Sequence, residues 1–218
     1  MEKNIKRFLF SIPSKRKNLS AEANIALQMG ALASKQIDIN RTRCIHPGGR
    51  PENIAEHNLM LAKVAPELAV LLYPELDENL VARYSTLHDD IEIYVGDTPT
   101  DTLANLDLSK KEDREKAGIN KLLEEYSHIP SYTRLITSYE SQTIPEAIFV
   151  RAVDKLMVLL IHIPNNGTTL QENYTYESFL ESEKTLLQRD RYKYGQFEKI
   201  VQLRKELAQE LADRYLKK

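Results

Sequence analysis

Apolar residues recur at helical spacing along most of the chain. Between residues 54 and 68 they fall three or four positions apart, the period of a helix that is buried on one face. Similar spacing predicts helices over residues 21–34, 110–126, 131–139, 175–189 and 196–216, and helices that open at Pro51, near Asn79 and at Pro145. Residues 37–51 and 97–109 lose the period, and Pro66 is expected to kink or restart its helix. The pattern therefore predicts an all-α protein.

Composition narrows the class of protein. The formal net charge is −2, so no overall positive field would attract nucleic acid. A single cysteine, Cys44, excludes an internal disulfide and fits a reducing compartment. No apolar run is long enough to span a membrane, and the apolar patch near the N-terminus is too short for a secretory signal. We expect a cytoplasmic protein with neither a membrane nor a nucleic-acid partner.

The stretch from Leu87 to Val95 places charged residues in apolar surroundings. His88 and Asp89 are adjacent, and Glu92 follows three positions after Asp89. Buried carboxylates are costly unless they are paired or bind a metal, and His with Asp is a usable ligand pair for a divalent cation. We expect the pair to lie on a helix that faces a cavity, with Glu92 nearby as an acid or base. The alternative is a solvated helix in which these residues have no special role.

Two other predicted helices contribute candidate ligands. His57 falls on the apolar face of one of them, and Asp154 lies within a nearly wholly apolar one. An inward histidine is more often a hydrogen-bonded core residue, and a salt bridge to Arg151 or Lys155 would explain Asp154. Together with the His–Asp pair, they give two imidazoles and two carboxylates, a set that suits Co²⁺, Mn²⁺, Fe²⁺, Mg²⁺ or Zn²⁺.

A basic segment precedes the helix of His57. Arg41, Arg43 and Arg50 lie close together in sequence, with two glycines before the last of them. Guanidinium groups match phosphate oxygens, so this segment could receive a phosphate. A solvated basic loop is the alternative.

These motifs, in this order, resemble a known family. His57, the pair His88-Asp89 and Asp154 follow the H…HD…D order of the HD-domain metal-dependent phosphohydrolases. Residues 50–57 (RPENIAEH) and 88–100 (HDDIEIYVGDTPT) look like the bacterial YfbR-type 5′-deoxynucleotidases. Residues 139–155 (YESQTIPEAIFVRAVDK) look like the related eukaryotic HD-domain deoxynucleotidases. The resemblance covers roughly residues 40–162.

The resemblance implies an all-α HD-domain helical bundle, often a homodimer, that hydrolyses deoxynucleoside 5′-monophosphates with a divalent metal. Within a single domain we expect an arm and first helix in residues 1–36, the core in 37–165, and helices that pack on it in 166–218. The implied metal ligands are His57, His88, Asp89 and Asp154, the implied catalytic pair is Glu92 and Asp97, and the implied phosphate-binding arginine is Arg43 or Arg41.

The chain also departs from this family at the substrate end. The family has an aromatic residue after its arginine, whereas this chain has no tryptophan, and residues 46–49 form an unusual loop. One alternative is an HD-type (deoxy)nucleoside triphosphate phosphohydrolase, in which Lys110 and Lys111 could help to hold a longer phosphate chain. Another is a non-catalytic, metal-stabilised module that senses nucleotides. The mildly acidic charge disfavours a nuclease.

Overall fold

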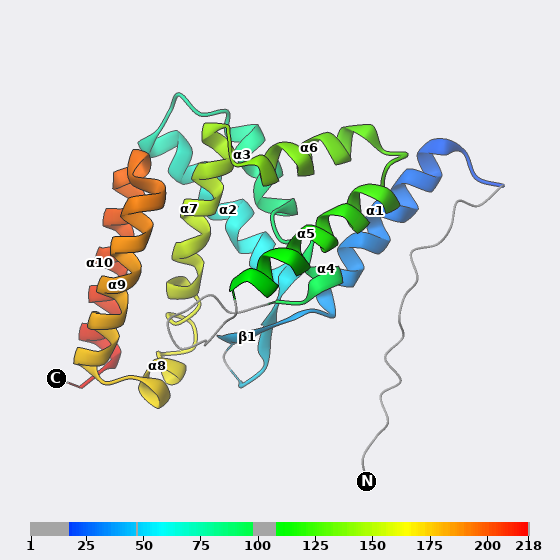
Figure 1. Cartoon of the computed structure of the whole chain (residues 1–218). Coiled ribbons are helices and arrows are strands. Elements are labelled where there is room, and N and C mark those ends of the chain that lie inside the picture. Colours follow the sequence, from blue (N-terminus) through cyan, green and yellow to red (C-terminus); the bar gives the residue numbers. More distant parts are fainter. Residues whose placement is uncertain (1–17, 47, 98–107, 218) are drawn as a thin grey trace, which may run out of the picture.

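The computed structural model describes residues 18–46, 48–97 and 108–217 (Figure 1). The elements are α1 (Ala21–Ile37), β1 (Asn40–Ile45), β2 (Pro51–Asn53), α2 (Ile54–Leu72), α3 (Glu78–Leu87), α4 (Glu92–Val95), α5 (Leu108–Glu125), α6 (Pro130–Ser141), α7 (Pro145–Leu160), α8 (Thr168–Asn173), α9 (Tyr176–Tyr194), the 3-10 turn η1 (Gly195–Phe197) and α10 (Glu198–Tyr215). The all-α prediction is confirmed, because the strands in this part of the chain form just one antiparallel pair. Among these residues no helix has both the length and the apolar character needed to cross a membrane.

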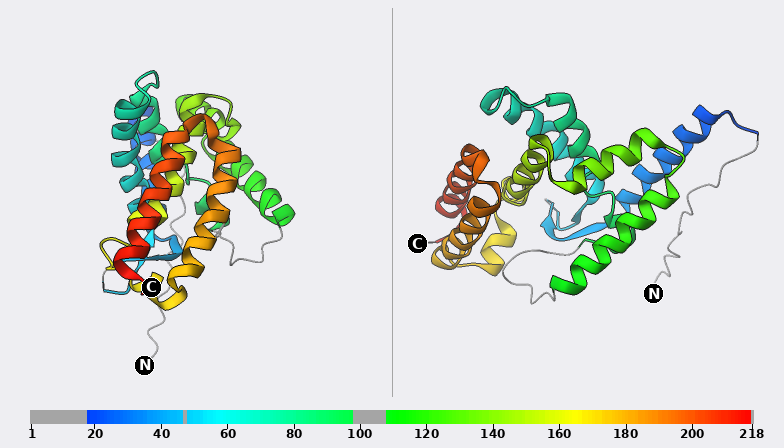
Figure 2. Two further views of the ribbon diagram at one scale, coloured as in Figure 1. Left: turned by 90° about the vertical axis from the view of Figure 1, so that its left-hand side faces the viewer. Right: turned by 45° about the horizontal axis from the view of Figure 1, so that its top comes forward.

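Helix α7 lies at the centre of the molecule. It packs against α2 and α3 on one side and against α9 and α10 on another (Figures 1 and 2). Phe149, Val150, Val153 and Leu156 of α7 are all buried, as expected of a helix that is apolar nearly all round. The main core runs from α2, α3 and α6 through α7 to Phe197, and a smaller cluster joins the end of α7 to α8, α9 and α10.

Helix α2 begins three residues later than the sequence predicts. Pro51 belongs to β2, and Asn53 caps the helix. The Glu56 backbone N–H donates to the Asn53 side chain at 3.0 Å, and the Glu56 carboxylate accepts from the Asn53 backbone N–H at 3.1 Å. This reciprocal cap fixes the start of α2 at Ile54 and so sets which residues of its first turn face inward.

Three other segments differ from the prediction. Residues 37–51 were expected to be irregular and Pro51 to open a helix, but residues 40–53 contain a hairpin in which Asn40 pairs with Asn53. Helix α2 passes through Pro66 without restarting, because Leu61, Ala65 and Ala69 hold both of its halves against the core. Helix α8 has no counterpart in the sequence prediction. The predicted N-terminal arm, residues 1–13, lies outside the described residues.

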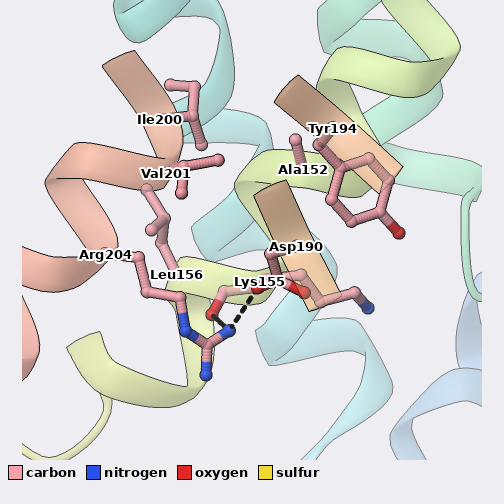
Figure 3. Close-up of a pocket in the computed structure, with 8 residues that line it drawn as sticks. All are labelled: Ala152, Lys155, Leu156, Asp190, Tyr194, Ile200, Val201 and Arg204. Atoms are coloured by element: carbon pink, nitrogen blue, oxygen red, sulfur yellow. Dashed lines mark hydrogen bonds and ion pairs between the residues drawn. The ribbon is translucent and has the colours of Figure 1, made fainter. Parts of the chain in front are cut away.

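A buried ionic cluster joins the α9–α10 hairpin to α7 (Figure 3). Arg204 of α10 donates to both carboxylate oxygens of Glu183, at 2.8 and 2.9 Å, and to Asp190 at 3.1 Å. The same guanidinium donates to the backbone carbonyl of Lys155 on α7 at 2.9 Å. All three charged side chains are less than a tenth exposed, so the cluster is enclosed between the helices.

Candidate metal centre

His57 is buried one turn into α2. Its exposed fraction is 0 %, as are those of Ile54 and Leu61 on the same face of the helix. The cap at Asn53 sets this orientation, because it fixes where the helical repeat begins. The inward position predicted for His57 is therefore observed.

His88 and Asp89 lie beyond the end of a helix. Helix α3 ends at Leu87 and α4 begins at Glu92, and backbone hydrogen bonds of 3.0 Å from Asp90 to Leu87 and from Glu92 to Asp89 hold the turn between them. The expectation that one helix carries the pair is therefore wrong. Adjacent side chains on a regular helix point about 100° apart. The turn instead brings His88 Nε2 to 3.1 Å from Asp89 Oδ2.

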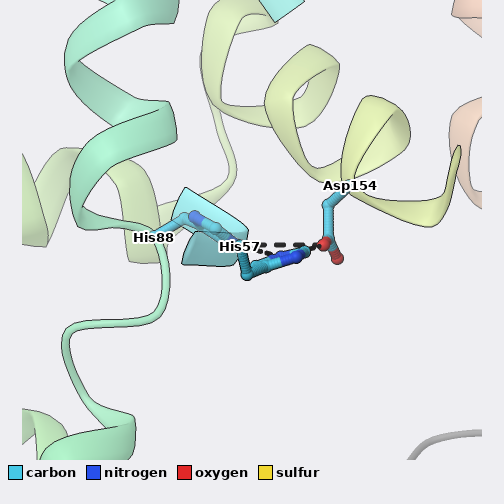
Figure 4. A group of neighbouring side chains, drawn as sticks. All are labelled: His57, His88 and Asp154. Atoms are coloured by element: carbon cyan, nitrogen blue, oxygen red, sulfur yellow. Dashed lines mark hydrogen bonds and ion pairs between the residues drawn. The ribbon is translucent and has the colours of Figure 1, made fainter. Parts of the chain in front are cut away.

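Four side chains from these segments converge, and Figure 4 shows three of them, His57, His88 and Asp154. His57 Nε2 lies 2.9 Å from Asp154 Oδ1 on α7 and 3.2 Å from His88 Nε2. Asp89 Oδ2 lies 3.6 Å from His57 Nε2, and Asp154 Oδ1 lies 3.8 Å from His88 Nε2. The structure thus brings together the four residues that the resemblance implies as ligands.

This donor set fits a divalent cation. Two imidazole nitrogens and carboxylate oxygens are ligands that Mn²⁺, Co²⁺, Fe²⁺ and Zn²⁺ accept. Bonds of about 2.1 Å place neighbouring ligand atoms about 3.0–3.4 Å apart in octahedral or tetrahedral geometry. Five separations that link these atoms, each involving an imidazole Nε2, run from 2.9 to 3.8 Å and bracket that range. The group of His57, His88 and Asp154 is therefore consistent with a divalent metal.

The electrostatics of the cluster also favour a cation. Burial would raise the pKa of Asp89, but His88, His57 and Arg41 hold it well below its usual value. Burial likewise opposes ionisation of Asp154, yet Lys155 and His57 lower the pKa of that carboxyl. Both carboxylates are therefore charged at neutral pH. Burial, with the charge of Arg41, lowers the pKa of His57, so this imidazole is neutral and able to ligate.

The arginines of the basic segment have different surroundings. Arg41 on β1 reaches the cluster, and its Nη1 donates to Asp89 Oδ2 at 3.2 Å. Arg50 is 57 % exposed and pairs with Glu56 at the start of α2, so no contact places it at the cluster. The side chain of Arg43 lies outside the described residues, as do those of Lys110 and Lys111.

Two further charged side chains lie next to the cluster, and the sequence pointed to only one of them, Lys155, as a salt-bridge partner of Asp154. Glu52 on β2 is 1 % exposed, and its Oε2 lies 3.4 Å from Arg41 Nε. Lys155 Nζ donates to the second carboxylate oxygen of Asp154 at 2.5 Å. Asp154 therefore makes both the salt bridge to Lys155 that the sequence suggested and the contact with His57 that metal binding requires. The one feature of the sequence that could have drawn attention to Glu52 is its position immediately before the capping residue Asn53. The burial of Glu52 could not be predicted, because it depends on the pairing of β1 with β2.

Glu92 and Asp97 lie beside the cluster. Burial and the charges of Asp89 and Asp97 raise the pKa of Glu92 to about 10. Its Oε2 is buried without a hydrogen-bond partner among the described residues. Asp97 is the last residue described before a gap, so Pro99 of the same motif lies outside the described part. A protonated carboxyl next to the ionised Asp89 is a pairing that acid–base chemistry uses.

Comparison with models of known protein families identifies the family of this chain. The family model described as an HD domain matches residues 33–193, most of the sequence. The chain belongs to the HD-domain family. All four residues of the cluster, together with Arg41, Glu52 and Glu92, fall within the matched range of this HD domain.

Solved structures extend the comparison. The HD-domain chain is similar to a protein from Magnetospirillum magnetotacticum named a predicted metal-dependent phosphohydrolase, with 27 % sequence identity and a TM-score of 0.66 over 89 % of this chain and 96 % of that one. A conserved hypothetical protein from Pyrococcus furiosus is 21 % identical, with a TM-score of 0.47 over 76 % of this chain and 99 % of that one. No curated protein matches the sequence.

Proposed function

We propose that this HD-domain protein is a metal-dependent phosphohydrolase that releases phosphate from deoxynucleoside 5′-monophosphates. The observation that carries the proposal is the convergence of two buried imidazoles and two ionised carboxylates beside the guanidinium of Arg41. The name of the Magnetospirillum relative supports the reaction class. The nucleotide preference is supported by the deoxynucleotidase-like segments at residues 50–57, 88–100 and 139–155.

His57, His88, Asp89 and Asp154 would hold the metal. When bound, a divalent ion would supply Lewis acidity toward a phosphate oxygen and lower the pKa of a coordinated water. Ser85 assists by fixing one ligand, since its carbonyl lies 3.0 Å from His88 Nδ1 and accepts the proton there. The Nε2 lone pair of His88 is then directed into the cluster.

Arg41 and Glu92 would act on the substrate. Arg41 is largely buried beside Asp89. Its guanidinium could therefore pair with the substrate phosphate in a place that excludes most of the water. Glu92 keeps its proton at neutral pH in the metal-free protein, which suits a group that protonates the leaving 5′-oxygen. Asp97, whose charge reaches Glu92, would orient or deprotonate the attacking water.

The decisive experiment is a phosphate-release screen on chelator-stripped protein, with each metal tested against each deoxynucleotide. We expect inorganic phosphate from monophosphates only when a divalent ion is added. Asp89→Ala should abolish both metal binding and release, while Asp113→Ala, the same change at an exposed site on α5, should alter neither. Wild-type turnover by Asp89→Ala would overturn the proposal.

The products separate the alternatives. Release of triphosphate from dATP would instead indicate an HD-type triphosphate phosphohydrolase. Metal binding without turnover of any nucleotide would indicate a sensing module. Glu92→Gln should retain Mn²⁺ affinity but lower kcat by roughly 10²–10⁴-fold, the usual contribution of general acid–base catalysis.

A further inference from the structure

Glu52 is a carboxylate in a place that needs an explanation. It is the inward residue of the three-residue strand β2, between partly exposed neighbours, and 1 % of it is exposed. Burial raises the pKa of Glu52 to about 7, even though the charge of Arg41 and a hydrogen bond with Cys44 oppose the shift. A buried carboxylate is costly unless nearby donors satisfy it, so the donors around Glu52 indicate its role.

Two of those donors belong to the metal cluster and its arginine. Glu52 Oε2 lies 3.4 Å from Arg41 Nε and 3.9 Å from His57 Nδ1. Arg41 Nε, His57 Nδ1 and Glu52 Oε1 are all buried and lack a hydrogen-bond partner among the described residues. The two unpartnered donors, Arg41 Nε and His57 Nδ1, thus both lie near Oε2 of the same carboxylate, whose other oxygen, Oε1, is also unpartnered. A movement of about 1 Å would bring His57 Nδ1 to the ordinary hydrogen-bond distance of about 2.9 Å.

The other ring nitrogen of His57 explains why this contact matters. Nε2 faces Asp154 and His88, and it can ligate a metal only when its lone pair is free. A neutral imidazole with a free Nε2 must carry its proton on Nδ1, and that proton needs an acceptor. His88 finds one in the Ser85 carbonyl. Among the described residues, Glu52 offers His57 Nδ1 a nearby acceptor, with Oε2 at 3.9 Å.

We propose that Glu52 is a positioning residue that accepts the Nδ1 proton of His57 and anchors the Nε of Arg41. One buried carboxylate then orients a metal ligand with one contact and the proposed phosphate-binding guanidinium with the other. Because Arg41 also donates to Asp89, Glu52 connects two ligands on separate segments. The role toward Arg41 rests on the proposed function, whereas the role toward His57 requires only that the cluster binds a metal.

The first test is the Nδ1–H of His57 in Zn²⁺-loaded protein, followed by ¹H–¹⁵N NMR. Without a metal, His57 Nε2 donates to the ionised Asp154 at 2.9 Å, so the loaded protein is the form in which the proton must lie on Nδ1. We expect a downfield Nδ1–H resonance that exchanges slowly with water in the wild type and in Glu52→Gln, whose amide oxygen still accepts, and its loss in Glu52→Leu. A wild-type Nδ1–H that exchanges rapidly would overturn the proposal, and this result does not depend on any variant folding.

The second test is Mn²⁺ affinity by calorimetry. Losing an outer partner of a metal-bound histidine costs about 10–100-fold in affinity. We expect a loss near the lower end for Glu52→Gln and near the upper end for Glu52→Leu. Glu67→Gln is the matched control, because it makes the same charge change at an exposed site on α2 and should leave affinity unchanged.

The outcomes separate the two proposals. Folded Glu52 variants that bind Mn²⁺ as tightly as the wild type would refute the role of Glu52. A wild type that binds no divalent ion would refute the proposed function and, with it, the role of Glu52 toward a metal-bound His57. With phosphate release as the readout, loss of the Arg41 anchor should raise KM for the nucleotide more than it lowers kcat.

Discussion

Replacing Arg204 should destabilise the protein strongly. Arg204→Ala leaves Glu183 buried without its cation, Asp190 with Arg189 alone, and the Lys155 carbonyl without its donor. Removing one partner of a buried ion pair costs about 3–5 kcal/mol, because the remaining charge stays out of water. The guanidinium here satisfies three groups, so we expect about 4 kcal/mol. For a chain of this size that lowers Tm by about 8–16 °C.

The assay is thermal and urea unfolding followed by far-UV circular dichroism. Arg214→Ala, which removes an exposed arginine from the same helix, is the control and should unfold like the wild type. A triple variant with Arg204→Met, Glu183→Leu and Asp190→Leu should recover most of the lost stability, since apolar side chains can replace a buried ionic cluster. An Arg204→Ala protein with wild-type Tm would refute the reasoning, as would a triple variant less stable than Arg204→Ala.

Three further predictions concern other parts of the molecule. Burial lowers the pKa of His162 to about 4. As the pH falls below 6.5, this histidine is therefore protonated in the unfolded chain before it is protonated in the folded protein. Its contribution to stability is complete above pH 6.5 and is lost as the pH falls toward 4. His162→Gln should remove about 2 kcal/mol of the difference in urea stability between pH 7 and pH 5. Gly118→Ala would place a Cβ 2.8 Å from Val95 Cγ1 on α4, so the free energy of unfolding should fall by about 1–3 kcal/mol. Because the clash would displace α4 and with it Glu92, kcat should also fall. The Mn²⁺ affinity measured by calorimetry should stay unchanged. Adding Mn²⁺ at 100 times its Kd to chelator-stripped protein should stabilise it by about 2.7 kcal/mol, a rise in Tm of about 5–11 °C, and Asp154→Ala should show no such rise.

Local patterns were enough to predict most of the helices. The spacing of apolar residues from Ile54 to Leu72 and through α7 reflects burial on one or all faces, which is a property of each segment alone. The hairpin β1–β2 could not be predicted in this way. Its strands are short, and their pairing joins residues such as Asn40 and Asn53 that no local period relates.

The same difference between local and long-range information decides which residues of the candidate site could be predicted. His57 and Asp154 could be recognised because each is a polar residue on an apolar helix face. The break at His88 and Asp89 was missed, because no glycine or proline marks it and the helical pattern continues across it. Glu52 and Arg204 were missed because their burial depends on partners in other elements.

The spacing of the converging side chains along the chain has a mechanical consequence. His57 and His88 are 31 residues apart, and His57 and Asp154 are 97 apart. An ion held by all three would close two large loops of the polypeptide at one point. It would tie distant segments of the folded chain together at one point, as a disulfide does in secreted domains, in a protein whose single cysteine cannot form one within the chain. Unfolding of the loaded protein would then have to open both loops at once.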